Sequence, residues 1–350
     1  MITDDLATPF DHIDGDTAIA IARERFGLYV QYEQRFEPER DDTFKVSGGD
    51  GAYALKLAHP SDAPEWIDFE IACVEHALAH DRTLPLARFL PVAGASWDTG
   101  TIDRAAVVAV GRDGTPTVER IARCAPWLHG VAVRSAPRTI AQITSIAIEQ
   151  SRLAAALAGL EHPAADRVLA WDVQHLSDLR TKADAVPAAT RATVVAILDA
   201  FDTVVAPALH ELPRQVIHGD ANLDNVLVAE HDAARVVAIL DFGDASRSAW
   251  IIDLAVAASY LLPVTPTDPT ANDVLTAVTS AAGSVAPLET LERDLLPLLT
   301  ACRLAQRLIL GSWLTAAAPE NVDYVSRSLA ITAGQLESML PLIAPDLRGL

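Results

Sequence analysis

The sequence predicts an α+β protein in which strands gather in the first third of the chain and helices dominate after residue 136. Residues 29–36 and 42–46 alternate between apolar and polar side chains, as half-buried strands do. Ala-, Leu- and Ile-rich segments of helical length occupy residues 140–160, 190–209 and 287–310. With 350 residues, the chain is long enough for two domains or lobes with a sizeable core.

The chain is expected to begin with a helix over residues 14–26, followed by a sheet. The glycines at positions 48, 49 and 51, with Asp50 among them, mark a hairpin turn. This turn joins the strand over residues 42–46 to another over residues 52–58, which carries Lys56.

Three shorter segments are expected to complete this first region. They lie at residues 85–92, 105–111 and 118–124, with a turn at 112–114. Pro126, Trp127 and Gly130 then interrupt the strand pattern. We therefore expect the connection between the two lobes in this region, with the lobe boundary after residue 126.

Two short acidic motifs follow one another between residues 216 and 246, each embedded in an apolar, strand-like run. His218, Gly219, Asp220 and Asn225 form the first, H-G-D-x-x-x-x-N, and Asp241–Asp244 form the second, D-F-G-D. An Asp can accept the proton of a hydroxyl, while an Asn and a second Asp can hold Mg²⁺ against a nucleoside triphosphate. These groups are the minimal equipment of a phosphoryl-transfer site, where positioning and charge neutralisation dominate catalysis.

The spacing also predicts how these groups meet. Gly219 permits a tight turn after a strand that ends at Ile217. Strands over residues 226–228 and 236–240, joined by a charged turn at 230–235, would form a hairpin with Asp220, Asn225 and Asp241 at one end. Asp, Asn and Gly are also the commonest turn residues, so one motif alone would be weak. Both motifs in this order favour the catalytic interpretation.

On these motifs the chain resembles the aminoglycoside phosphotransferase and choline kinase group of kinase-like enzymes, and most of all its hydroxylysine kinase branch. The matching stretches are YALKLA at 53–58, APWLHG at 125–130, HGDANLDNVLV at 218–228, ILDFGDAS at 239–246 and WIIDLAVAASY at 250–260. The resemblance implies a two-lobe, protein-kinase-like fold. A small antiparallel-sheet lobe over residues 1–126 would bind nucleotide, and a larger, mostly helical lobe over residues 127–350 would bind substrate and catalyse.

Lys56 is the expected nucleotide-binding lysine. The chain has three lysines, and this one stands inside an apolar strand of Ala, Leu and Tyr. Because the two acidic motifs follow downstream, we predict that Lys56 contacts the α- and β-phosphates of a nucleotide. The alternative is an edge-strand lysine that discourages aggregation.

A phosphate-binding lysine is usually held by a helical glutamate. Ser61 or Asp62 can cap a helix whose first turn contains Pro64. Glu70 and Glu75 flank its apolar stripe symmetrically, so periodicity does not choose between them. The family resemblance favours Glu70 as the partner of Lys56.

Two further nucleotide contacts are expected in the first lobe. No G-x-G-x-x-G precedes the lysine strand, and the equivalent loop covers residues 36–43, where Thr43 and nearby amides would touch phosphate. Kinase-like enzymes bind adenine through backbone groups of the connection between lobes, which here is Cys124–Trp127. The alternative is a plain linker with a core tryptophan.

Three residues near the motifs have supporting roles. The resemblance implies that Asp253, an acid within an apolar helix, braces the catalytic loop, because a buried Asp is costly unless paired. His218 is expected to anchor the loop by hydrogen bonds. Asp244 directly follows the metal-binding motif and is a candidate for approaching the substrate.

Arg303 and Arg307 share a helix face at i, i+4 and are candidates for binding a substrate carboxylate. The alternative interpretation is that at least one of them is structural or faces solvent, since Arg often buries its stem and leaves its charge wet.

Composition narrows the class of protein. The net charge of −20 disfavours nucleic acid as a partner and suits a cationic or zwitterionic small molecule. Cys73, Cys124 and Cys302 are sparse and widely spaced, which fits a reducing cytoplasm. The first residues lack the pattern of a signal peptide. The most apolar stretch, residues 249–264, is too short to span a bilayer, so we expect no membrane association.

The sequence therefore predicts a kinase that transfers the γ-phosphoryl group of ATP, or of GTP, with Mg²⁺, to a hydroxyl of an amine-bearing small molecule. Hydroxylysine-like amino alcohols are favoured. An aminoglycoside O-phosphotransferase that confers resistance and a catalytically inactive nucleotide-binding regulator are the alternatives. A protein kinase is disfavoured, because the Gly-rich loop and an A-P-E segment are missing. The oligomeric state stays open, with a homodimer among the alternatives.

Overall fold

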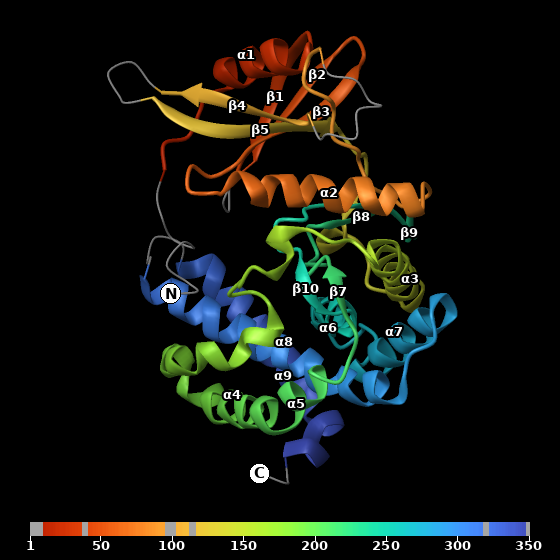
Figure 1. Ribbon diagram of the computed structural model, residues 1–350. Coiled ribbons are helices and arrows are strands. Elements are labelled where there is room, and N and C mark those ends of the chain that lie inside the picture. Colours follow the sequence, from red (N-terminus) through yellow and green to blue (C-terminus); the bar gives the residue numbers. More distant parts are fainter. Residues whose placement is uncertain (1–9, 37–40, 95–102, 112–116, 318–321, 348–350) are drawn as a thin grey trace. The chain divides into compact units, whose positions relative to one another are not determined.

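A computed structural model describes residues 10–36, 41–94, 103–111, 117–317 and 322–347 (Figure 1). The chain forms two compact units. The first runs to His129 and also includes His162–Ala164, and the second comprises Gly130–Glu161 and the residues from Ala165 onward. Trp127, at the start of the predicted second lobe, thus belongs to the first unit.

The first unit is built around an antiparallel sheet. Its elements are α1 (Gly15–Phe26), β1 (Val30–Phe36), β2 (Asp42–Gly48), β3 (Gly51–Leu57), α2 (Pro64–His80), β4 (Ala105–Val110) and β5 (Val118–Pro126). The sheet order is β1-β2-β3-β5-β4, and every neighbouring pair is antiparallel. The predicted glycine hairpin is confirmed, since Gly48 pairs with Gly51 at the end of β2 and β3.

The two faces of this sheet carry different residues because side chains alternate along each strand. One face is apolar: Phe44, Leu55 and Cys124 are fully buried in a core cluster that also contains Ile21 and Phe26 of α1. On the opposite face, Ile121 and Ala58 pack against Ile67 and Ile71 of α2. The sheet therefore lies between α1 and α2.

One prediction for this unit, the cap of α2, needs correction, and two predicted segments lie at least partly outside the described residues. The helix α2 begins after Ala63, which gives no side-chain cap, and Ser61 bonds to His59 instead of capping. Pro64 does stand in the first turn, where a missing N–H costs nothing. Residues 85–92 form no strand, although the amides of Leu90 and Val92 bond to neighbouring carbonyls. The loop residues 37–40 and the turn at 112–114 are outside the described part.

The second unit is mostly helical. Its helices are η1 (Val133–Ser135), α3 (Ile140–Leu157), η3 (Val173–Ala185), α4 (Ala188–Ala200), the π-helical η4 (Phe201–Val205), α5 (Ala206–Leu209), α6 (Ile251–Leu261), α7 (Ala271–Val285), α8 (Thr290–Ala317) and α9 (Val322–Leu347). The short 3₁₀ turn η2 (Pro163–Asp166) begins in the first unit and ends in the second. Its strands are β6 (Val131–Ala132), β7 (Arg214–Ile217), β8 (Val226–Ala229), β9 (Asp232–Ile239) and β10 (Ser246–Ala249). They form two small sheets, β7 with β10 and β8 between β6 and β9.

The hairpin of β8 and β9 is confirmed, with a shorter turn than predicted. β9 begins at Asp232, four residues before the predicted start at Val236. Irregular pairing between Leu227 and Ala229 absorbs the extra residues. At the other end Val226 pairs with Ile239, so the residues just before β8 and just after β9 meet there.

The helix predicted over residues 190–209 is interrupted. A π-helical turn, η4, separates α4 from α5, and Pro207 follows it. Proline has no N–H to continue an α-helical hydrogen-bond ladder, which accounts for the change of geometry near it.

Within the described residues, one helical run, Ala188–Leu209, is long and apolar enough to cross a membrane by length and composition. The stretch singled out from the sequence, residues 249–264, contains only the shorter helix α6. Core helices of soluble proteins meet the same criterion. In this run 39% of the apolar window is buried. Val194, Ile197 and Leu198 are among the buried residues, and α4 contacts η3, α8 and α9.

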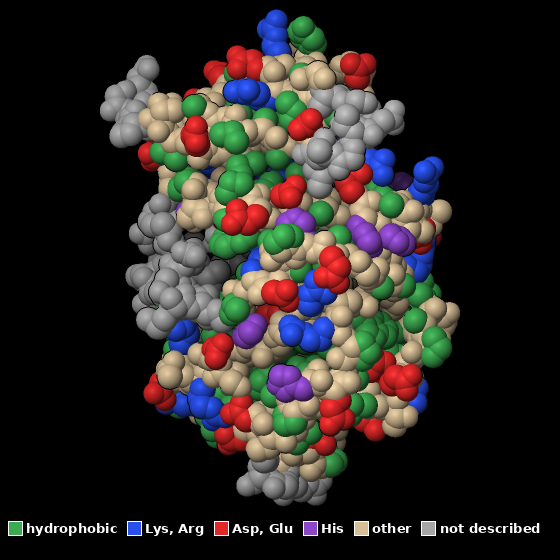
Figure 2. All heavy atoms as spheres, viewed as in Figure 1, with side chains coloured by type: hydrophobic (Ala, Val, Ile, Leu, Met, Phe, Trp, Pro, Cys, Tyr) green, Lys and Arg blue, Asp and Glu red, His purple; other side chains and the backbone are tan. Residues whose placement is uncertain are grey.

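The surface carries the acidic excess without a single dominant patch on the face that Figure 2 shows. Acidic side chains there are scattered among basic and neutral ones. The acidic side chains on this face therefore do not mark a binding site, whose position has to come from the side-chain geometry.

Candidate active site

The first motif forms a tight loop after β7. Gly219 adopts a left-handed φ of 79°, and a Cβ there would lie 2.6 Å from the carbonyl oxygen of Asp244. Only glycine fits this position without a backbone shift. The His218 ring is buried, with Nε2 3.0 Å from the carbonyl oxygen of Leu240 and its edge against Phe242. His218 thereby ties the first motif to the second.

Asp253 holds the same loop from α6. Its side chain is fully buried and accepts the backbone N–H groups of His218 at 3.0 Å and Gly219 at 2.7 Å. Burial raises the pKa of Asp253, whereas the charge of His218 and these two hydrogen bonds favour the carboxylate. The acid inside an apolar helix is therefore paired with the backbone of the first motif.

Removing this carboxylate should destabilise the protein. We expect Asp253→Ala to lower the free energy of unfolding by about 2–4 kcal/mol, because it leaves two buried N–H groups without an acceptor. Asp253→Asn, which keeps one acceptor oxygen, should lose less. Urea unfolding monitored by circular dichroism measures both variants. An alanine variant as stable as the wild type would contradict the bracing role.

The carboxylate of Asp220 is held on both sides. Oδ2 accepts from the side-chain amides of Asn222 at 2.7 Å and Asn225 at 2.8 Å, and Oδ1 lies 3.2 Å from the guanidinium of Arg303. The side chain of Asp220 remains 18% exposed. Its orientation is therefore fixed while a small molecule can still reach it. The sequence alone did not single out Asn222 as a partner of Asp220.

Asn225 and Asp241 lie together at the open end of the β8–β9 hairpin. The amide of Leu240 bonds to the carbonyl of Asn225 at 2.8 Å, which places Asp241 next in line. Asp241 is exposed and has a left-handed φ of 65°, the only such non-glycine among the described residues. Such backbone strain in a non-glycine residue recurs at functional sites. Its Oδ1 accepts the amide of Gly243 at 3.0 Å.

These two side chains suit a hard divalent cation. Asn225 uses its Nδ2 for Asp220, so its carboxamide oxygen is the group that would face a metal, together with the carboxylate of Asp241. Carboxylate and amide oxygens are ligands that Mg²⁺ prefers, and it commonly uses few protein ligands plus substrate phosphates. Among the described residues, no group of three or more His, Cys, Asp or Glu side chains is arranged to hold a metal.

Asp244 is half-buried beside the same carboxylates. Burial and the charges of Asp220 and Asp241 together raise the pKa of Asp244 to about 7, although the charges of Arg303 and Arg167 oppose the shift. Arg167 also bonds to the carbonyls of Gly243 and Ala245 and so supports the second motif. No sequence pattern connects Arg167 with a motif 76 residues away, which is why it was missed.

The two arginines of α8 have different surroundings. Arg303 is 1% exposed and bonds to Asp220, the carbonyl of Trp171 and Gln306. It is therefore a structural partner of the carboxylate. Arg307 is half-buried and its guanidinium lies 4.1 Å from the ring centre of Tyr260.

In the first unit, Lys56 lies in a polar cross-strand row on the α2 face of the sheet. Thr43 pairs with Lys56 on one side and Arg123 pairs with it on the other. The buried Arg123 forms ion pairs with Glu70 of α2 at 2.8 Å and Asp41 at 2.7 Å. Through this ion pair with Arg123, Glu70 lies next to the cross-strand row that contains Lys56. Sequence reasoning did not single out Arg123, which stands in an otherwise apolar strand.

Glu75 has its own partners. Its carboxylate lies 3.2 Å from both Arg88 and Arg104, so it is engaged on another side of α2. Of the two glutamates that periodicity left equal, Glu70 is the one beside the strand row of Lys56.

Two backbone groups of the predicted adenine-binding segment already form hydrogen bonds within the first unit. The carbonyl of Cys124 accepts the amide of Leu90 at 2.7 Å, and the amide of Trp127 donates to Ala52 at 2.9 Å. Trp127 is half-buried and stacks on Phe36, so it is not a core tryptophan. A base contact through this segment remains a prediction.

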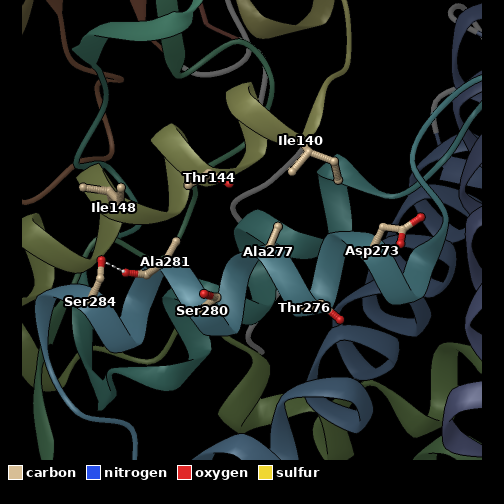
Figure 3. Close-up of a pocket in the computed structure, with 9 residues that line it drawn as sticks. All are labelled: Ile140, Thr144, Ile148, Asp273, Thr276, Ala277, Ser280, Ala281 and Ser284. Carbon is tan, nitrogen blue, oxygen red and sulfur yellow. Dashed lines mark hydrogen bonds between the residues drawn. The ribbon is translucent and has the colours of Figure 1, made fainter.

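A groove of about 520 Å³ lies elsewhere in the second unit, between α3 and α7 (Figure 3). Ile140, Thr144 and Ile148 line one wall, and Thr276, Ser280 and Ser284 line the other. None of the predicted site residues contributes to it, so it is not the candidate active site.

Comparison with known proteins agrees with this geometry. A model of the phosphotransferase enzyme family matches residues 34–288. Hydroxylysine kinase of Danio rerio is 24% identical over 314 residues, covering 87% of this chain and 85% of that protein. The microcompartment-associated aminopropanol kinase is 17% identical, with a TM-score of 0.71 over 95% of this chain and 98% of that one. An amicoumacin kinase, solved with AMP-PNP and Ca²⁺, is 14% identical, with a TM-score of 0.66 over 93% of both chains.

The family match covers well over half of the chain, so the chain belongs to the phosphotransferase enzyme family. It is a small-molecule phosphotransferase that acts on hydroxyl groups. The predicted resemblance to this family and to hydroxylysine kinases is confirmed. The two solved kinases support the fold, which is the predicted kinase-like α+β arrangement of an antiparallel N-terminal sheet and a helical C-terminal part.

Proposed function

We propose that this chain uses ATP and Mg²⁺ to phosphorylate a hydroxyl of a small amine-bearing acceptor, with hydroxylysine-like amino alcohols favoured. The observation that carries the proposal is the loop in which Asp220 is held by Asn222, Asn225 and Arg303 beside the strained Asp241. GTP is an alternative phosphoryl donor.

On the acceptor side, Asp220 would orient the hydroxyl and take its proton. The hydroxyl oxygen then forms a bond to the γ-phosphorus of ATP, the bond to the β-phosphate oxygen breaks, and ADP leaves. Asn222, Asn225 and Arg303 hold the carboxylate in place through this step, and Asp253 fixes the backbone beneath it. The protein thus contributes mainly positioning, as phosphoryl transfer requires.

On the donor side, Lys56 would contact the phosphates, with Glu70 placed beside its strand row and Thr43 next to it. Asn225 and Asp241 would hold the cation, which supplies charge neutralisation for the triphosphate. Residues Cys124–Trp127 would meet the adenine.

Two observations support a small amino alcohol as acceptor. Hydroxylysine kinases match over most of the chain. The chain is acidic, which suits a cationic or zwitterionic substrate. The three buried cysteines form no disulfide with one another, which suits a cytoplasmic enzyme.

A panel assay tests this proposal. Wild-type protein with Mg²⁺ and ATP should release ADP only when an acceptor hydroxyl is present, and hydroxylysine should be turned over with a higher kcat/KM than choline or kanamycin. Kanamycin-like compounds as the best acceptors would instead establish an aminoglycoside phosphotransferase. Tight ATP binding without stimulation by any amine or alcohol would support the inactive regulator.

A further inference from the structure

Arg307 lies on the same face of α8 as Arg303, one helical turn further on. Arg303 contacts the Asp220 carboxylate directly, at 3.2 Å. The charge on Arg307 interacts with Asp220 and with Arg134, and Arg134 bonds to Asp224 of the same loop. Arg307 therefore belongs to the surroundings of the candidate catalytic loop.

Its partners set it apart from the buried arginines of this chain. Arg104, Arg120, Arg123 and Arg303 are the arginines classed as buried among the described residues, and each forms an ion pair with a carboxylate. Arg307 forms no ion pair with any described residue. Its hydrogen bonds go to the carbonyl of Ser259 at 3.2 Å and the side chain of Gln335 at 3.3 Å, both neutral acceptors.

The remaining edge of the guanidinium has the shape for a carboxylate. Both hydrogen bonds of Arg307 leave from Nη1, and Tyr260 covers one face of the group at 4.1 Å. The edge formed by Nε and Nη2 can donate two parallel hydrogen bonds to a planar anion.

The charge balance also favours an anion there. Burial lowers the pKa of Arg307, and the positive charge of Arg303 lowers it further. Tyr260 and Asp220 raise this pKa and so offset part of the decrease. The chain has 47 Asp and Glu residues and 27 Lys and Arg residues. A half-buried arginine that forms no ion pair with a carboxylate is therefore suited to bind an anionic ligand.

We infer that Arg307 binds a carboxylate group of the acceptor and so selects hydroxylated amino acids over amino alcohols that lack an acid group. The inference rests on the proposed function, since it names the substrate class of that site. Arg303 is excluded from this role because it is already bound to Asp220. Arg307 is thus a specificity-determining residue that would touch the acceptor away from the reacting hydroxyl.

The test compares hydroxylysine with the diamino alcohol obtained by removing its carboxyl group. For the wild type, we expect KM to be about 10- to 100-fold lower for hydroxylysine, the scale of a charge-assisted contact. Arg307→Met should remove this difference by raising KM for hydroxylysine alone, with kcat little changed. Arg307→Lys, a point charge without the planar fork, should restore part of it. Arg180→Met, which removes a charge from an exposed ion pair with Asp199 and Asp202, is the matched control.

Calorimetry on the wild type can measure the binding of both compounds in the presence of ADP. This measurement requires neither turnover nor a folded variant. Tighter binding of hydroxylysine supports the inference, and equal binding overturns it. If Arg307→Met raises KM for ATP instead, the residue contacts the donor and the inference is wrong. Acceptor-dependent turnover of both compounds with equal KM would reject the inference but keep the proposed kinase, whereas ADP release without any acceptor would reject the kinase itself.

Discussion

Asp220→Asn is expected to lower turnover about 10²–10⁴-fold with every accepted acceptor, the scale of a lost general base. The amide cannot take the proton of the acceptor hydroxyl. It also places a donor among the donors of Asn222, Asn225 and Arg303, which now all point at a carboxylate. Steady-state ADP release gives the rate, and calorimetric ADP binding together with thermal unfolding shows whether the nucleotide site and fold persist.

Asp224→Asn is the matched control for this variant. Asp224 lies in the same loop, but its side chain is 52% exposed and pairs with Arg134 rather than with Asp220. Its replacement should leave turnover close to that of the wild type. Near-wild-type turnover of Asp220→Asn would mean that another group accepts the proton.

Asp241→Ala is expected to abolish Mg²⁺-dependent turnover, by about 10³-fold or more, because a catalytic cation stabilises charge by several kcal/mol. Asn225→Ala should act more weakly, with a higher Mg²⁺ requirement, since it removes one neutral ligand. It also removes a donor to Asp220, so part of its loss should persist at saturating Mg²⁺. Titration of Mg²⁺ at fixed ATP separates the two effects.

Asp232→Ala provides the comparison for the metal variants. Asp232 is exposed at the turn end of the same hairpin, away from Asn225, and its loss should not change the Mg²⁺ titration. Identical Mg²⁺ dependence of Asp241→Ala, Asn225→Ala and the wild type would reject the metal-binding roles.

Much of this site follows from local sequence. The two acidic motifs, Gly219 in its turn and the β8–β9 hairpin all depend on residues within about one hairpin of one another. Alternation and turn residues determine such units because the backbone geometry is local. Asp253 also fits its context, since an acid in an apolar helix requires a partner.

The features of the site that the sequence did not predict depend on contacts between segments that are distant in the chain. Arg167 reaches the second motif across 76 residues, and Arg123 meets Glu70 across a sheet and a helix. Periodicity left Glu70 and Glu75 equal because each flanks the apolar stripe. Their ion pairs distinguish them, since Glu70 pairs with Arg123 and Glu75 pairs with Arg88 and Arg104. The separate environments of Arg303 and Arg307 could not be predicted either, because helical spacing puts them on one face.

Identification of the reaction product is the most direct test of the central claim that this chain transfers a phosphoryl group to an acceptor hydroxyl. Wild-type protein, ATP, Mg²⁺ and hydroxylysine would be incubated together, and the mixture analysed by phosphorus NMR and mass spectrometry. The account predicts ADP and an O-phosphorylated acceptor in equal amounts, with neither formed by Asp220→Asn at a comparable rate. Inorganic phosphate with unmodified acceptor, or phosphorylation on an amine nitrogen, would contradict it.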